Sequence, residues 1–73
     1  MNIDVVKLRN KINEKNMSVA KFSSEIGIDV STFYRKIEAN GNGFTIGEVH
    51  KAAEVLELDG AEAVGIFLPQ YSH

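Results

Sequence analysis

The chain has 73 residues, a net charge of -2 and no cysteine. A chain of this length supports one domain with a small core, and the lack of cysteine excludes disulfide bonds and thiolate metal sites. No stretch is apolar enough for a signal peptide or a membrane span, so we expect a soluble intracellular protein.

The charge is distributed unevenly along the chain. Residues 1–38 hold seven of the eight Lys and Arg against five carboxylates, a balance of +2, whereas residues 39–73 hold Lys51 against five carboxylates, a balance of -4. The overall negative charge argues against a nucleic-acid partner, because affinity for DNA depends on cations that neutralise phosphates. A two-ended chain is nevertheless compatible with one side that faces DNA.

The first predicted helix is capped by Asn2 and ends near Asn16. Its apolar residues Val5, Leu8 and Ile12 recur at intervals of three and four and form one stripe. The other faces carry four cations, which either solubilise the helix or contact phosphates. These cations are Lys7, Arg9, Lys11 and Lys15.

A second helix is predicted over residues 19–26, with the hydroxyl of Ser18 as its N-cap. Phe22 and Ile26 are four residues apart and face inward. Gly27 follows directly, and glycine adopts at low cost the left-handed conformation that ends a helix.

The third predicted helix covers about residues 30–39. Asp29 or Ser31 is available as its cap, and Phe33 and Ile37 lie on one face. This face is apolar, so we expect it to pack against the second helix.

The run Asn-Gly-Asn-Gly at residues 40–43 predicts a turn, and a fourth helix follows it. Thr45 and Glu48 have the spacing of a capping box. The expected apolar stripe of this helix consists of Ile46, Val49, Ala53 and Leu56, with Ala52 small enough for close packing.

A fifth helix is predicted after Asp59, with Glu62 in its first turn, and Pro69 is expected to end regular structure. The C-terminal segment is more apolar than one helical stripe requires. Its Val64, Phe67 and Leu68 either close the core or face a second copy of the chain. No strand pattern, repeat or linker is present, so we expect residues 1–73 to form a single all-α domain, a compact bundle of five helices.

Residues 19–37 have the pattern of a helix-turn-helix. Such a unit needs a glycine at the bend, a small residue where the two backbones approach, and apolar residues that lock the helices together. Gly27 supplies the bend, and Ser23 stands four residues before it. The lock consists of Phe22, Ile26, Ile28, Phe33 and Ile37.

The chain resembles the phage repressor and Cro class of DNA-binding domains, the XRE-like or lambda-repressor-like family. It is most similar to the short regulators carried by phages and prophages of Gram-positive bacteria. The matching segments are residues 25–28, 31–37, 44–46 and 52–58. The resemblance implies five helices, binding to operator DNA as a dimer and a third helix in the major groove. Two positions depart from the family pattern, Ser23 in place of alanine and Val19 in place of a polar residue.

Helical geometry divides the third helix into faces. At about 100° per residue, Ser31, Thr32 and Arg35 lie opposite Phe33 and Ile37. Arginine has the fork that binds guanine, and short hydroxyl side chains reach base edges or phosphates. Tyr34 on the flank suits a phosphate or a thymine methyl group. The predicted DNA-binding residues are Ser18, Lys21, Ser31, Thr32, Tyr34, Arg35 and Lys36.

No other chemistry has a comparable pattern. The two histidines, His50 and His73, are far apart and have no convincing carboxylate cluster, so no metal or cofactor is expected, and no nucleophile lies at a recognisable spacing from a base. We therefore predict a transcriptional regulator without enzymatic activity. It would bind double-stranded DNA as a homodimer, and the C-terminal segment would form the contact between the two copies. Two alternatives remain: a protein-interaction module on the same frame, and an accessory factor for phage DNA recombination or maintenance.

Overall fold

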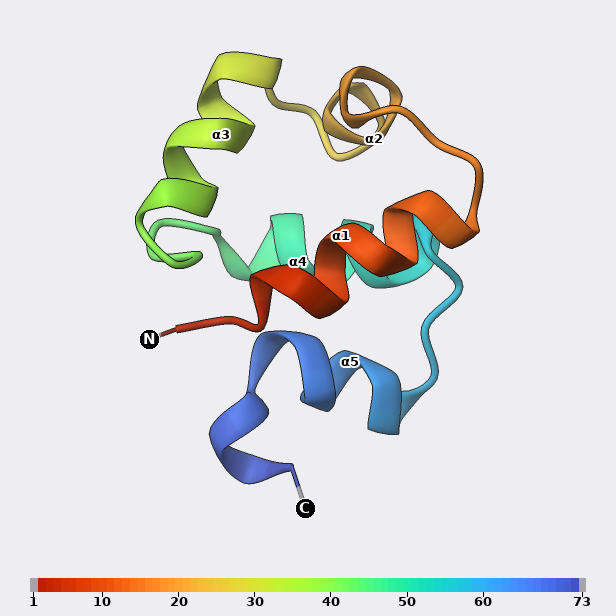
Figure 1. The fold of residues 1–73 in the computed structure, drawn as a ribbon, viewed down its shortest axis with the longest axis vertical. Helices are drawn as coiled ribbons and strands as arrows, with labels where there is room; N and C mark the ends of the chain where they lie inside the picture. The colour runs from red at the N-terminus through yellow and green to blue at the C-terminus, as the bar shows by residue number, and fades with distance from the viewer. Residues whose placement is uncertain (1, 73) are drawn as a thin grey trace.

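The computed structural model describes residues 2–72, and this part of the chain is all-helical, with no strand. The five predicted helices are present, which confirms the expected fold class (Figure 1). A short 3-10 helix follows them. The elements are α1 (Val5–Glu14), α2 (Val19–Glu25), α3 (Val30–Glu38), α4 (Ile46–Val55), α5 (Gly60–Phe67) and η1 (Pro69–Tyr71).

The helices surround one core, with α2 and α3 at one end of the molecule and α5 at the other. In Figure 1, α1 runs between these two ends, and the C-terminus lies beside α5. α2 packs against both α3 and α4, and α5 packs against α1. The C-terminal segment is therefore remote from the helix-turn-helix.

Local side-chain chemistry explains where most of the helices begin. Ser18 Oγ accepts a hydrogen bond from the Lys21 N–H at 3.0 Å, as predicted for the start of α2. The capping box of α4 is confirmed, because the Glu48 N–H donates to Thr45 Oγ1 and the Thr45 N–H donates to Glu48 Oε1, both at 3.0 Å. Asp59 and Glu62 form the same arrangement at the start of α5.

The prediction of Asn2 as the cap of α1 is wrong. Asp4 occupies that position, and its carboxylate accepts a hydrogen bond from the Lys7 N–H at 3.0 Å. The reason is that the backbone of Ile3, the residue before Asp4, forms a hydrogen bond outside the helix. The Ile3 N–H donates to the Asn40 carbonyl at 2.9 Å, so the chain is already held at Ile3 and the helix starts beyond it.

This first segment joins the two ends of the molecule. Besides the bond from Ile3, the Asp4 N–H donates to the Ile66 carbonyl of α5 at 2.7 Å. The Ile3 side chain lies directly on Gly41, where any Cβ would collide with it. Gly41 also has a φ of +84°, so glycine is required there for two independent reasons.

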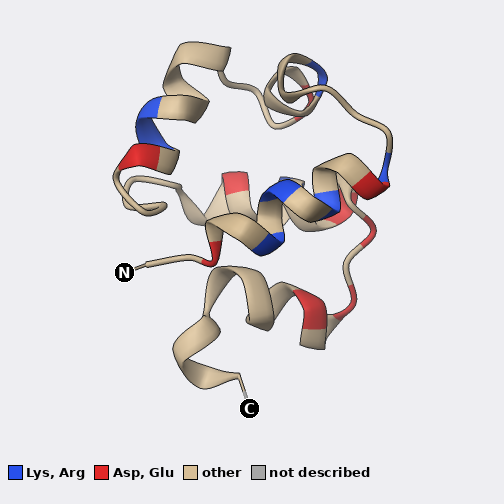
Figure 2. Ribbon diagram, viewed as in Figure 1, with Lys and Arg blue, Asp and Glu red and all other residues tan. Residues whose placement is uncertain are grey.

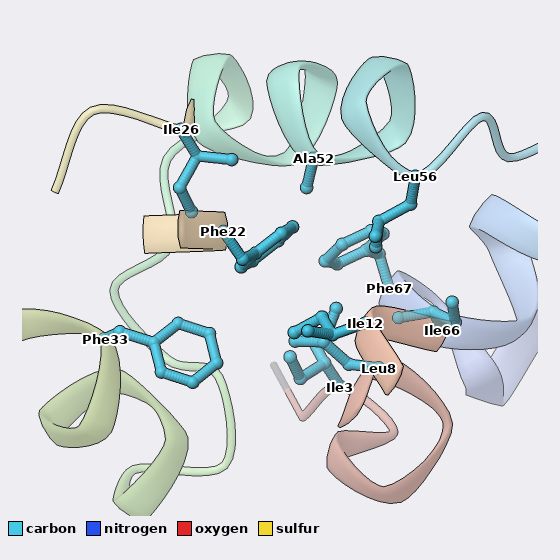
Figure 3. Packing of buried hydrophobic residues seen from close by; sticks show 10 residues of the cluster. All are labelled: Ile3, Leu8, Ile12, Phe22, Ile26, Phe33, Ala52, Leu56, Ile66 and Phe67. Carbon is cyan, nitrogen blue, oxygen red and sulfur yellow. The ribbon is translucent and has the colours of Figure 1, made fainter. Parts of the chain in front are cut away.

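Within residues 2–72, the core is formed by ten buried apolar residues from the N-terminal segment and all five α-helices (Figure 3). The rings of Phe22 and Phe33 pack edge to face, with centroids 5.8 Å apart. The buried apolar residues are Ile3, Leu8, Ile12, Phe22, Ile26, Phe33, Ala52, Leu56, Ile66 and Phe67.

The predicted apolar stripe of α4 is wrong at one position. Ile46 is 87% exposed, whereas Ala52 is buried. At about 100° per residue, Ala52 and Leu56 share one face and Ile46 lies at the edge of it. Ile46 is also the first residue of the helix, and so lies in the exposed first turn.

The C-terminal segment closes the core to a large extent. Ile66 and Phe67 are buried, while Val64 and Leu68 are half-buried. α5 ends at Phe67, and the prediction that Pro69 ends regular structure is wrong, because Pro69 starts the single turn of η1. Proline is well suited to this first position, which requires no N–H donor.

Ion pairs connect the basic first helix to the acidic second half of the chain. Lys11 Nζ lies 2.6 Å from Glu62 Oε2, and Lys15 Nζ lies 2.7 Å from Glu57 Oε2. The hydrogen bond from Lys15 lowers the pKa of Glu57, and that from Lys11 lowers the pKa of Glu62. The uneven charge of the sequence thus serves partly to hold α5 and the segment before it against α1.

These pairs predict a loss of stability in acid. A carboxylate with a lowered folded pKa stabilises the fold above its ordinary value of 4.5, and this contribution is lost as the pH falls through the folded pKa. We expect the free energy of unfolding in urea to decrease as the pH falls below 4.5. The double variant Glu57→Gln with Glu62→Gln should show a weaker decrease, since glutamine still completes the capping box. An identical pH profile would contradict a role for these pairs.

Ser23 is a buried polar residue without a partner. It is 1% exposed, and its hydroxyl is the one buried side-chain polar atom within residues 2–72 that makes no hydrogen bond. We expect Ser23→Ala to raise the free energy of unfolding by about 1–2 kcal/mol, because the cost of burying the unpaired hydroxyl disappears. Urea denaturation measures this change.

The neighbouring Ser24 is a matched control for that substitution. It lies on the same helix and is exposed, so Ser24→Ala gains only the higher helix propensity of alanine, about 0.5 kcal/mol. If Ser23→Ala were less stable than the wild type, the hydroxyl would have to make a hydrogen bond in solution.

Candidate nucleic-acid interface

The turn between α2 and α3 has the geometry that the sequence predicts. Gly27 has a φ of +83°. The Ile28 N–H donates to the Ser23 carbonyl at 2.9 Å, and the Gly27 N–H donates to the Ser24 carbonyl at 3.1 Å, so these two carbonyl groups in the last turn of α2 are satisfied. The edge-to-face contact of Phe22 with Phe33 then fixes the two helices against each other.

Asp29 stands at the N-cap position of α3, one of the two predicted caps. Its side chain makes no capping hydrogen bond. The helix therefore begins with backbone geometry alone, and its start is not closed by a side chain.

Three of the predicted DNA-binding residues lie on the outward side of α3. Ser31 and Arg35 are exposed, and Thr32 is half-buried. Arg35 Nη2 donates a hydrogen bond to Thr32 Oγ1 at 3.0 Å. This bond between successive turns holds the guanidinium along the helix surface. Arg35 therefore loses less conformational entropy when it binds a ligand.

Tyr34 lies on the flank of α3 that faces α1. Its ring packs edge-on against Phe33 with centroids 5.7 Å apart, and the Arg9 guanidinium carbon lies 5.9 Å from its centroid. Sequence reasoning did not single out Arg9 from the other cations of α1, because the contact joins two helices and has no signal in local spacing. The structure places Arg9 next to the predicted interface.

Lys36 lies on the opposite flank of α3 and makes contacts within the protein. Its ammonium nitrogen is 2.7 Å from Glu48 Oε1 and 2.7 Å from the Gly43 carbonyl oxygen. Burial alone would raise the pKa of Glu48, but hydrogen bonds from Lys36 and from the Thr45 N–H outweigh it and lower the pKa. Lys36 is thus set apart from the other predicted residues by its partners.

The start of α2 contributes two further predicted residues. Ser18 is exposed, and its hydroxyl oxygen is the cap described above. Lys21 is exposed as well, and its ammonium lies 3.0 Å from Glu25 Oε1 one turn later. Exposed pairs of this kind are weak, so Lys21 remains accessible to another anion.

Two shallow hollows flank Thr32. One has a volume of about 450 Å³ and is lined by Ser24, Gly27, Ile28, Asp29 and Thr32. The other has a volume of about 210 Å³ and is lined by Thr32, Arg35, Lys36 and Asn42. The lining of the second hollow includes Asn42, so the turn at residues 40–43 lies beside α3. The sequence predicted this turn but not its position in the fold.

The described residues contain neither a metal site nor a membrane helix. No group of three or more His, Asp or Glu within residues 2–72 is arranged to hold a metal ion. His50 lies 3.6 Å from Glu54 on the same helix, and His73 lies outside the described residues. None of the helices in this range is both long and apolar enough to cross a bilayer.

Comparison with known proteins identifies the family. No curated protein and no solved structure gives a significant match to the chain. A family model for the Cro/C1-type HTH DNA-binding domain matches residues 7–66, which include α2, α3 and α4 and most of α1 and α5. The chain therefore belongs to the family of Cro/C1-type helix-turn-helix DNA-binding domains.

Proposed function

We propose that the protein is a sequence-specific transcriptional regulator that places α3 in the major groove of an operator. The observation that carries this proposal is the outward side of α3, where Arg35 is exposed and held by Thr32 at 3.0 Å. Family membership supports DNA binding by a regulator of this type. Repression of a promoter, a phage or prophage context and a bacterial cytoplasmic location are the finer parts of the proposal.

Six of the seven predicted residues, all but Lys36, have a role on DNA that suits their chemistry. Arg35 would donate both arms of its guanidinium to the O6 and N7 of a guanine. Ser31 and Thr32, in the first turn of α3, would reach base edges or phosphates, and Tyr34 a phosphate or a thymine methyl group. Ser18 and Lys21 at the start of α2 would hold the DNA backbone and so fix the orientation of α3.

The modest charge of this face favours two copies on one operator. Seven cations in residues 1–38 are offset by five carboxylates, and Lys11 and Lys15 are paired with Glu62 and Glu57. One copy would therefore release few counterions from DNA and bind weakly. A dimer would double the contacts and place two α3 helices about 34 Å apart, one DNA turn.

The C-terminal segment is the proposed contact between the two copies. Residues 63–72 carry no charge, and in Figure 2 the ribbon is tan from the middle of α5 onward. Val64 and Leu68 are half-buried and Tyr71 is 69% exposed, so apolar surface remains for a partner. Sedimentation equilibrium of the wild type and of Tyr71→Glu tests this contact, because a buried charge would weaken self-association.

A protein-interaction module on the same frame is the second candidate, and the net charge of -2 favours it. Fluorescence anisotropy of a labelled duplex over a salt series separates the two. The DNA-binding proposal predicts binding at low salt that weakens linearly in log–log form as salt rises. No binding at low salt would reject it in favour of the protein-interaction module.

A third candidate, an accessory factor for phage DNA recombination or maintenance, also binds DNA. A promoter reporter distinguishes it from a regulator. The regulator changes the output of a promoter that contains the bound sequence, whereas the accessory factor leaves it unchanged.

A further inference from the structure

Lys36 forms the least exposed ion pair within residues 2–72. Its side chain is 16% exposed and that of Glu48 is 17% exposed, whereas each other pair has at least one partner that is more than twice as exposed. In the same range it is also the only ion pair that joins α3 to another helix. The Lys36–Glu48 pair therefore differs from the other ion pairs in this range both in its burial and in the helices that it joins.

The acceptors of Lys36 belong to two different parts of the chain. The Gly43 carbonyl lies in the loop after α3, and Glu48 lies in the first turn of α4. Glu48 also accepts the capping bond from the Thr45 N–H. One ammonium thus connects the last turn of α3, the loop at residues 40–45 and the start of α4.

The contacts leave little of this ammonium for DNA. Two of its three protons are donated to oxygens at 2.7 Å, and its charge is balanced by the Glu48 carboxylate. The Phe44 ring covers another side, with its centroid 5.3 Å from Nζ. A phosphate would have to displace partners that are already well placed and partly shielded from water.

We propose that Lys36 is a positioning residue, which clamps the loop and α4 onto α3 and makes no contact with phosphate. This inference rests on the proposed function, because the position of α3 matters to DNA. It assigns Lys36 a different role from Lys21, which is exposed and paired only within its own helix. The two lysines therefore provide a matched comparison.

Salt dependence of DNA binding distinguishes positioning from contact. The probe is a labelled duplex selected by the wild type from a random pool, and the variants are Lys36→Met, Glu48→Gln and Lys21→Met. A positioning role predicts that Lys36→Met and Glu48→Gln both weaken binding, by roughly tenfold, with the salt slope unchanged. Lys21→Met should instead reduce the slope by about 0.9, the value for one phosphate contact.

If Lys36 contacted a phosphate, substitution of its partner Glu48 would change the affinity for DNA in the opposite direction. Glu48→Gln would then free the ammonium and strengthen binding, and Lys36→Met would reduce the slope by about 0.9. Either result overturns the proposal. Lys36→Arg keeps the charge and should recover part of the lost affinity. The double variant Lys36→Met with Glu48→Gln leaves no unpaired, partly buried carboxylate, so it avoids the loss of stability that such a charge causes.

Hydrogen exchange tests the clamp without DNA. The Gly41 N–H donates to the Lys36 carbonyl at 2.7 Å, and the Phe44 N–H donates to the Gly41 carbonyl at 3.3 Å. The double variant should exchange these loop amides about tenfold faster and leave those of α5 unchanged. Unchanged loop exchange would overturn the clamp even if the wild type bound DNA. If the wild type bound no duplex, the proposed function would fail, and faster loop exchange would still establish the clamp.

Discussion

Phe33→Ala is expected to lower the free energy of unfolding by about 3–5 kcal/mol. The ring is completely buried and packs edge-on against Phe22, Tyr34 and Phe44, with centroids 5.8, 5.7 and 6.4 Å away. Its removal leaves a cavity at the contact that fixes α3 to α2. A chain of this size has a total stability of roughly 4–11 kcal/mol, so the variant should be partly or wholly unfolded at room temperature.

Urea denaturation followed by far-UV circular dichroism measures this loss. Phe33→Leu retains most of the apolar volume and should be destabilised less. Val6→Ala is the surface control, because Val6 is 69% exposed and its truncation should change stability by no more than about 0.5 kcal/mol. A Phe33→Ala variant within 1 kcal/mol of the wild type would show that the α2–α3 contact does not depend on this ring.

Arg35→Ala is expected to reduce affinity for a selected duplex about 10- to 100-fold, which corresponds to the roughly 1–3 kcal/mol of a bidentate guanine contact. The loss should be smaller on random DNA, since only the selected duplex has the guanine in place. Arg35→Lys keeps the charge but not the fork, so it should keep most of the affinity for random DNA and lose the preference for the selected sequence. Competition anisotropy with both duplexes measures the two effects.

Lys51→Ala is the matched control for the lost charge. Lys51 is an exposed cation on α4 with no ion pair among the described residues, and its removal changes the net charge by the same amount. The substitution should weaken binding to both duplexes slightly and equally. If Arg35→Ala behaved like Lys51→Ala, the recognition role of Arg35 would be rejected.

The features that sequence reasoning predicted correctly are local ones. Ser18 and the Thr45–Glu48 capping box act within one helical turn, and Gly27 needs only its own backbone freedom. The aromatic lock of Phe22 and Phe33 follows from helical spacing together with a short turn. These signals lie within a few residues of each other, so the sequence displays them directly.

The features that it missed depend on contacts between distant segments. Asn2 was predicted as the cap of α1, but the Ile3 N–H donates to the Asn40 carbonyl and Asp4 caps the helix instead. Ile46 fitted an apolar stripe but lies in an exposed first turn. The Lys36–Glu48 pair joins residues on two helices, and no local pattern distinguishes that lysine from one on a solvated face.

The central claim is that the exposed surface of α2 and α3 binds DNA. Amide chemical-shift mapping of the labelled protein with a selected duplex tests it most directly. The claim predicts that the largest changes fall at Ser18, Lys21 and residues 31–35, with little change in α5 beyond any effect of dimerisation. Shifts concentrated in α5, or no shifts at low salt, would contradict it.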